Sequence, residues 1–196
     1  MQRSAFSESL LLGEAKVKGT IMRLIDPILA ELDQETSSTR NLLSRVPEDK
    51  LGWKPHPKSM SLGQLAFHVA VVPGGIAEAA CLDQFELPEF KHPDPKNKKE
   101  ILDSLEQSVA TARQKLGALD DARLLATWTA TKNGKQMMAI PRIGVIRSIL
   151  LNHWYHHRGQ LDVYLRLLNV PLPSIYGPTA DENPFAETKA SEVAAR

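Results

Sequence analysis

Residues 146–168 read IRSILLNHWYHHRGQLDVYLRLL. Apolar residues recur in this stretch at spacings of three and four positions, which is the pattern of an α-helix with one apolar face. That face includes two histidines and consists of Ile146, Ile149, Leu150, His153, His157, Leu161, Tyr164, Leu165 and Leu168. Pro141 suits the first turn of the helix, and Pro171 and Pro173 follow its expected end near Asn169. The stretch therefore predicts a long helix that packs against other helices.

Three further segments have helical spacing. The first lies within residues 20–45, where Pro27 either starts the main helix or bends a longer one. The second begins at Ser61 with the capping-box pattern Ser-x-x-Gln, and Pro73-Gly74-Gly75 is expected to kink or interrupt it. The third runs from residue 97 to about residue 116. Four long helices predict an all-α four-helix bundle.

The regions between the last three helices are harder to assign. Residues 83–96 are acidic and proline-rich, which predicts a loop. Asn133-Gly134 lies between two short apolar runs within residues 122–140, and an Asn-Gly pair in that setting is a hairpin signal. We expect a short irregular hairpin or an extended loop there, before the last helix, and no real sheet. The domain is expected to span residues 20–177, between a lead segment (1–19) and a mobile tail (178–196).

Composition narrows the classes of function. The chain has 196 residues, with 42% apolar and 24% charged residues and a net charge of +1, so it makes no electrostatic case for nucleic acid or an anionic membrane as partner. Cys81 is the only cysteine, which excludes an internal disulfide and a cysteine-based zinc site. The apolar run Leu10-Leu11-Leu12 stands among charged residues and is too short for a signal peptide or a membrane span. A cytoplasmic protein is expected.

Three of the six histidines stand where apolar residues are expected. His153 and His157 are four positions apart on one helix, so both rings lie on the same face. His68 interrupts the apolar face of the second helix in the same way. A buried imidazole needs a hydrogen bond or a metal ion. The three residues are therefore either hydrogen-bonded core histidines or ligands that converge on one metal ion.

The other candidate ligands fit less well. His156 lies about 100° around the helix from His157 and is expected to point toward the rim. His56 and His92 stand in proline-rich segments and are expected at the surface. Cys81 follows His68 by thirteen residues, which is about 20 Å along a continuous helix, so its thiol cannot join the site.

Two histidine motifs and the end of the chain resemble the DinB superfamily. The motifs are Trp53-Lys54-Pro55 with Ser61-Leu62-Gly63-Gln64-Leu65-Ala66-Phe67-His68, and Leu150 through Leu161. The ending is Ile175-Tyr176-Gly177-Pro178-Thr179-Ala180-Asp181-Glu182. The resemblance implies a four-helix bundle with a long crossover, a homodimer, and one zinc, nickel or iron ion bound by His68, His153 and His157. Characterised members of the superfamily that this chain resembles include S-transferases that use bacillithiol, isomerases that use mycothiol, and the iron domain of enzymes that sulfurise histidine derivatives.

Three histidines leave a tetrahedral ion one open position, as in catalytic rather than structural zinc sites. Such an ion lowers the pKa of a bound thiol or water, which suits thiol transfer or hydrolysis. The resemblance to the DinB superfamily implies thiol transfer, so we expect a thiol-dependent S-transferase acting on a small molecule. A metal-dependent hydrolase is the second reading, because no carboxylate stands at helical spacing to serve as a general base. A non-enzymatic metal-binding stress-response protein is the third.

Several residues near the histidines have alternative interpretations. Gln160 is either a partner of a metal ligand, a substrate contact, or an amide bonded to backbone. Arg158 either binds a substrate carboxylate at the pocket rim or forms an ion pair that is structural or lies at a dimer interface. Gly159 is expected to permit close packing of the last helix against another helix. The aromatic side chains of Trp53, Trp128 and Tyr155 either line a pocket or belong to the core.

Overall fold

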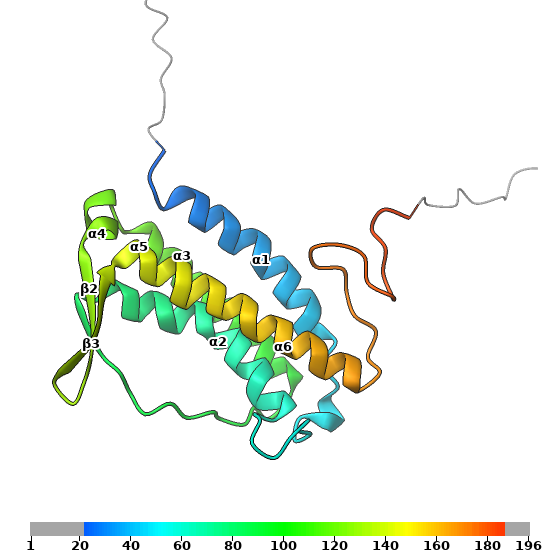
Figure 1. The fold of residues 1–196 in the computed structure, drawn as a ribbon. Coiled ribbons are helices and arrows are strands. Elements are labelled where there is room, and N and C mark those ends of the chain that lie inside the picture. Colours follow the sequence, from blue (N-terminus) through cyan, green and yellow to red (C-terminus); the bar gives the residue numbers. More distant parts are fainter. Residues whose placement is uncertain (1–21, 187–196) are drawn as a thin grey trace, which may run out of the picture.

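Four long helical segments lie alongside one another, and a small sheet covers one end of them (Figure 1). The computed structural model describes residues 22–186, so the expected lead segment 1–19 lies outside the described residues. The helices are α1 (Asp26–Ser44), α2 (Leu62–Cys81), α3 (Lys98–Gly117), α4 (Asp121–Leu125), α5 (Arg142–Val145) and α6 (His153–Leu167), with a 3₁₀ turn η1 (Glu48–Lys50) and a π-helical segment η2 (Ile146–Asn152). The strands are β1 (Gln84–Glu86), β2 (Thr127–Lys132) and β3 (Lys135–Pro141).

A long crossover makes α2 and α3 run in the same direction. Residues 82–97 leave the end of α2 beside the sheet and return along the molecule to the start of α3 (Figure 1). Two contacts agree with this direction: the Cys81 thiol donates to the Lys115 carbonyl at 3.5 Å, and the Gly74 amide donates to Ser108 Oγ at 2.7 Å. The crossover passes over the face of α2 that carries His68.

Helix α2 is the central helix and begins with the expected capping box. The Gln64 amide donates to Ser61 Oγ at 3.1 Å, and the Ser61 amide donates to Gln64 Oε1 at 3.0 Å. The expected interruption at Pro73-Gly74-Gly75 does not occur, because α2 continues to Cys81. A Cβ at Gly74 would lie 2.9 Å from the backbone of Ser108, so this glycine allows α3 to approach α2 closely.

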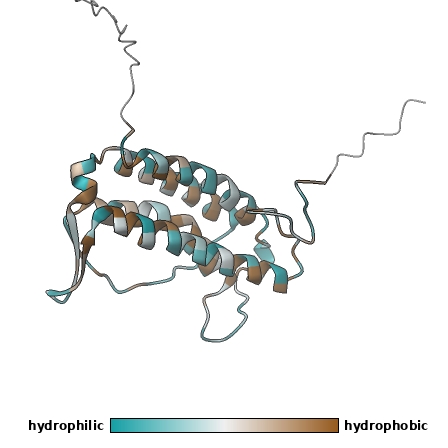
Figure 2. Cartoon of the chain, turned by 45° about the horizontal axis from the view of Figure 1, so that its top comes forward, coloured by the Kyte–Doolittle hydropathy of each residue, from teal (hydrophilic) through white to brown (hydrophobic). Residues whose placement is uncertain are grey.

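Helix α2 is also long and apolar enough to cross a membrane by length and composition. However, 56% of its most apolar window is buried inside the protein, as in the core helix of a globular domain. Figure 2 shows polar and apolar residues alternating around the long helices, as in helices with one face in a core. We therefore read α2 as the core helix of this fold.

The expectation of an all-α protein without a real sheet is wrong. Strands β2 and β3 form the hairpin that Asn133-Gly134 predicted, with φ angles of 51° and 74° at the turn. Strand β1, from the crossover that was expected to be a loop, pairs in parallel with β2 and completes a three-stranded sheet. The fold is mostly helical with a small sheet. The third strand depends on a pairing between segments more than forty residues apart, which local periodicity cannot show.

Arg142, the first residue of α5 after strand β3, connects this part of the chain to the end of α2. Its side chain is fully buried and donates to the carbonyls of Ala80 and Leu82, at 2.7 and 3.1 Å. It also forms an ion pair with Asp83 at 2.6 Å. The carbonyls at a helix C-terminus lack partners within the helix, so Arg142 satisfies groups that would otherwise be buried without hydrogen bonds.

The end of the described chain folds back on α1 and α6. The Asp181 carboxylate accepts from the Leu172 amide and from Arg166, and Glu182 accepts from the Ser174 amide. The expected boundary at residue 178 thus lies inside a hydrogen-bonded segment. Residues 187–196 of the expected mobile tail lie outside the described residues.

Candidate metal centre

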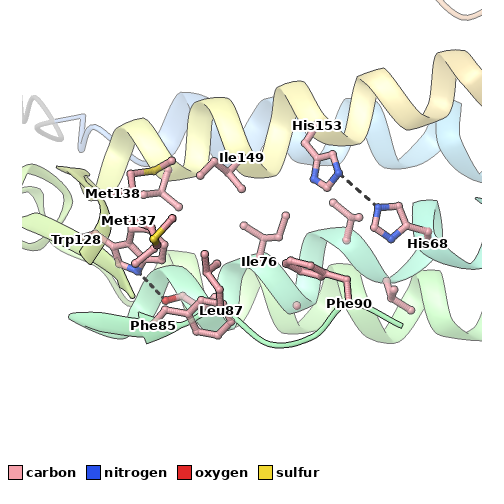
Figure 3. Close-up of a pocket in the computed structure, with 16 residues that line it drawn as sticks. His68, Ile76, Phe85, Leu87, Phe90, Trp128, Met137, Met138, Ile149 and His153 are labelled. Carbon is pink, nitrogen blue, oxygen red and sulfur yellow. Dashed lines mark hydrogen bonds between the residues drawn. The ribbon is translucent and has the colours of Figure 1, made fainter. Parts of the chain in front are cut away.

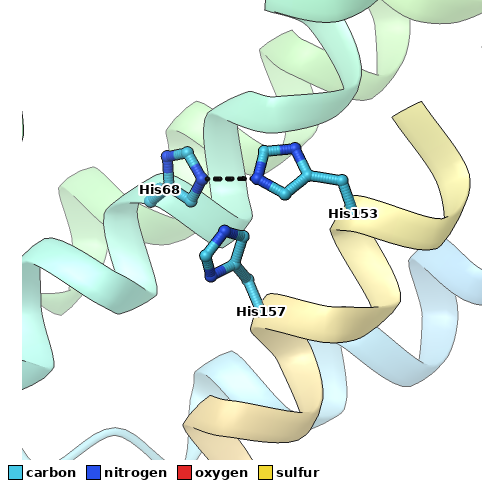
Figure 4. A group of neighbouring side chains, drawn as sticks. All are labelled: His68, His153 and His157. Atoms are coloured by element: carbon cyan, nitrogen blue, oxygen red, sulfur yellow. Dashed lines mark hydrogen bonds between the residues drawn. The ribbon is translucent and has the colours of Figure 1, made fainter. Parts of the chain in front are cut away.

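The three histidines singled out in the sequence point toward one another between α2 and α6 (Figure 4). His68 Nε2 and His153 Nε2 are 3.5 Å apart. The His157 ring centroid is 4.5 Å from each of the other two. One ligand atom from each residue lies within 4.8 Å of the other two, and no cysteine or carboxylate among the described residues joins this group.

A hydrogen bond between the neighbours of two of these histidines sets the distance between the helices. Trp154, next to His153, is fully buried and its indole Nε1 donates to the carbonyl of Val69 at 2.8 Å. Val69 follows His68 directly. Because the bond joins adjacent positions on α2 and α6, it holds the two imidazoles at a fixed separation.

The apolar face of the last helix differs from the expected one. The fully buried hydrophobic positions of η2 and α6 are Ile146, Leu150, Leu151, Trp154, Leu161 and Leu165. The π-helical segment η2 ends at Asn152 and changes the register just before His153. Such segments are common at functional sites. The change leaves His153 and His157 half-buried at the flank of the core, where a ligand can reach them.

The separation of two of the ligand nitrogens is close to that in a tetrahedral metal site. Zinc–nitrogen bonds of about 2.0–2.1 Å in tetrahedral geometry place two ligand nitrogens about 3.3–3.4 Å apart. The observed separation of 3.5 Å between the Nε2 atoms of His68 and His153 is close to that value. His153 Nδ1 is buried and has no hydrogen-bond partner among the described residues. The two Nε2 atoms are a different pair of nitrogens from that Nδ1, and at 3.5 Å a shared cation satisfies both of their lone pairs better than this long contact does.

Burial keeps the three rings in the neutral form that binds metals. Desolvation, and next the neighbouring rings of His157, His153 and His92, lower the pKa of His68 to about 4. Burial also lowers the pKa of His153 and of His157. Near neutral pH each imidazole therefore has a free lone pair.

Gln160 holds one of the rings in place, as one reading of the sequence predicted. Its Oε1 lies 2.8 Å from His157 Nδ1. The amide oxygen can only accept, so His157 donates from Nδ1 and keeps the Nε2 lone pair toward the other histidines. Partners of this kind orient metal ligands and increase their basicity.

Replacing Gln160 with leucine is expected to weaken metal binding about 10- to 100-fold without unfolding the protein. The variant frees the His157 ring to rotate and to change tautomer, whereas the exposed Gln160 side chain contributes little to the core. Competition with a chelator measures the affinity. Gln107→Leu, at an exposed position of α3, serves as the matched control. Equal affinities in the two variants would show that the contact to Nδ1 does not matter.

Arg158 is not at the pocket rim, which corrects one of its two predicted roles. Its side chain is buried and forms an ion pair with Glu35 at 2.6 Å. It also donates to Thr39 Oγ1 at 3.1 Å and to the hydroxyl of Tyr176. Arg158 thus follows the alternative prediction of a structural ion pair, and it fixes α6 against α1.

The remaining predicted residues divide between surface and core. His56 and His156 are exposed, and neither belongs to the histidine group. Gly159 is exposed and a Cβ there would meet nothing within 4 Å, so no other helix of the described chain packs closely against it. Trp53 packs edge-on against Tyr164. Tyr155 donates to Glu31 at 2.9 Å.

Two features near the histidines escaped the sequence reasoning. His92 is exposed as expected, but its ring centroid lies 5.8 Å from that of His68. The crossover brings it there, and the long-range hydrogen bond from Gln64 to the His92 carbonyl, at 3.2 Å, holds this part of the crossover beside α2. The second feature is an apolar cavity of about 420 Å³ that begins at His68 and His153, with Trp128 at its far end (Figure 3).

Comparison with known proteins identifies the family of the chain. A model of the DinB family matches residues 18–189, which is most of the chain. The chain belongs to the DinB family. Among relatives, the DinB chain is similar to the uncharacterized protein YrdA of Bacillus subtilis (strain 168), with 26% identity over 165 residues that cover 83% of this chain and 93% of that protein.

Two solved DinB-like structures have the same fold as this DinB chain. One, from Bacillus cereus ATCC 10987, has a TM-score of 0.62 at 24% identity and covers 78% of this chain and 97% of its own. The other, YjoA from Bacillus subtilis, has a TM-score of 0.60 at 16% identity and covers 76% of this chain and 97% of its own. At these identities the likeness concerns the fold of the DinB chain alone.

Proposed function

We propose that this DinB-family protein binds one divalent metal ion through His68, His153 and His157 and uses it for thiol-dependent transfer to a small molecule. The convergence of three half-buried, neutral imidazoles from two helices carries the proposal. Imidazole ligands suit zinc, nickel and iron. Three protein ligands are the usual number in catalytic sites, whereas structural sites usually have four.

The protein's own residues have separable tasks in this proposal. The three histidines supply neutral nitrogens, and Gln160 orients His157 through Nδ1. A bound divalent ion would supply Lewis-acid chemistry that lowers the pKa of a thiol or water near it. The cavity wall beside His68 and His153 is apolar, so water finds few hydrogen-bond partners on that side of the site. A substrate that displaces this water would strengthen the electrostatic interaction of the ion with an anionic sulfur.

Thiol transfer is preferred to hydrolysis because of what surrounds the histidines. A general base must lie within hydrogen-bond reach of the water that it activates. In the described part of the chain, no carboxylate belongs to the histidine group or lines the adjoining cavity. A thiol has a pKa of about 8.5 before it binds, far below that of water, so a metal ion ionises it more readily and without such a base.

Titration of a cobalt-substituted protein with thiols tests the proposal. Each thiol that binds the metal is expected to change the visible spectrum, and the loaded protein is expected to transfer low-molecular-weight thiols to electrophilic acceptors. His153→Ala is the blank, and protein without a histidine tag avoids adventitious metal. A spectrum that no thiol or anion changes would count against the enzyme and favour a metal-binding protein without catalysis.

A further inference from the structure

The cavity beside the histidines is almost entirely apolar. Its volume of about 420 Å³ lies within the range of small-molecule sites, about 300–1,000 Å³. Side chains of α2, the crossover, the hairpin and the last helix line it, among them Ile76, Leu87, Met137 and Ile149. No charged side chain is among its described lining residues. The indole Nε1 of Trp128 already donates to the Ala79 carbonyl at 3.0 Å.

The polar atoms of the cavity are gathered at one end. His68 and His153 stand there, and Trp128, Phe85 and Met137 close the opposite end (Figure 3). A ligand that fills this space therefore meets nitrogen ligands at its head and only carbon and sulfur along its body. A polar body with carboxylates or hydroxyls would lose water there without gaining hydrogen bonds.

Large apolar side chains at the cavity wall remain exposed. Phe90 of the crossover is 73% exposed and Met137 of β3 is 56% exposed. Exposed apolar groups that surround a concave site typically mark a binding surface. Methionine side chains are flexible and adapt to ligands of different shape.

We propose that the substrate of this site is a small molecule with an apolar body, such as an alkyl chain, and a thiol head group. The body lies in the cavity between α2, the crossover and β3, and the thiol lies at His68 and His153. This assignment rests on the proposed function, because it places the sulfur at the same histidines, and it adds the chemical class of the substrate.

A series of alkanethiols from propanethiol to hexanethiol tests the proposal on the full-length cobalt-substituted protein. Burial of one methylene contributes about 0.8 kcal/mol, so the affinity is expected to rise about three- to fourfold with each added carbon. 6-Mercaptohexanol has the same six-carbon chain as hexanethiol but carries a hydroxyl at its far end. It is expected to bind at least about fivefold more weakly than hexanethiol. 2-Mercaptoethanol serves as the short polar reference.

A cavity-filling variant gives a matched control. Gly75 lines the cavity, and a Cβ there would meet nothing within 4 Å, so Gly75→Leu is expected to fold. It is expected to lower hexanethiol affinity about tenfold or more, roughly the contribution of two methylenes, and to leave 2-mercaptoethanol unchanged. Gly159→Leu places the same side chain at an exposed glycine of α6, outside the cavity, and is expected to change neither affinity.

The outcomes separate this proposal from the proposed function. If 2-mercaptoethanol changes the cobalt spectrum but chain length has no effect, thiol binding stands and the apolar substrate is wrong. That result would indicate that another segment of this chain or a second copy covers the cavity. If no thiol changes the spectrum, calorimetry with straight-chain alcohols decides. An affinity for alcohols that rises with chain length and falls in Gly75→Leu supports an apolar ligand without thiol chemistry. If no alcohol binds, both the apolar substrate and the proposed function are wrong.

Discussion

Replacing Arg158 with methionine is expected to destabilise the protein by about 3–5 kcal/mol, because it leaves the buried Glu35 carboxylate without its cation. Arg158 is 2% exposed and Glu35 is 5% exposed, and the two form an ion pair at 2.6 Å. Tyr176 donates to Glu35 at 2.9 Å and is the only other side-chain partner of that carboxylate among the described residues. One neutral hydrogen bond does not compensate a buried negative charge. Denaturant unfolding of the metal-free protein measures the change.

The control for Arg158 is an arginine on the same helix whose ion pair faces water. Arg166 pairs with Asp181 at 2.6 Å, and its side chain is 44% exposed. Arg166→Met is expected to lower the free energy of unfolding by at most about 1 kcal/mol. The double variant Arg158→Met, Glu35→Leu should recover much of the loss, since it removes both charges together. Similar losses for Arg158→Met and Arg166→Met would contradict a structural role for the buried pair.

The buried ion pair shows where sequence reasoning reached its limit. Arg158 follows His157, so its position beside the histidines was evident, and both a rim site and a structural pair were predicted. Choosing between them required the position of Glu35, which is more than one hundred residues away in sequence. It also required Tyr176, from the segment after α6, which donates to Glu35 and accepts from Arg158. Periodicity places a residue on a face of a helix but does not identify its partner on another helix.

The histidine group could be predicted because each of its members violates a local pattern. An imidazole at an apolar position is conspicuous, and the spacing of His153 and His157 requires no tertiary information. The cavity, by contrast, is lined by residues that are ordinary for a core, such as Ile76 and Ile149. Their role as lining depends on the crossover and on β1, whose pairing with β2 joins segments distant in sequence. Apolar composition alone does not distinguish the wall of a cavity from a packed core.

Alanine substitutions of His68, His153 and His157 are each expected to reduce metal affinity by more than about 100-fold, the upper end of the loss when an outer partner is removed. Each variant leaves two of the three imidazoles, but most metal sites in proteins need at least three protein ligands for tight binding. Elemental analysis after exhaustive dialysis is expected to give about one metal per chain for the parent protein and almost none for each variant.

His156→Ala is the decisive control, because it removes an imidazole from the same helix turn without touching the group. The His156 side chain is exposed, and its ring centroid lies 5.0 Å from that of His157. The variant is expected to retain the full metal content. His157→Ala tests whether His156 can take the place of His157, because a movement of the His156 ring toward the other two histidines would preserve metal binding in that variant. Full metal content in His157→Ala together with its loss in His156→Ala would replace His157 by His156 as the third ligand. Full content in all three triad variants would remove the site altogether and leave the three rings as hydrogen-bonded core histidines.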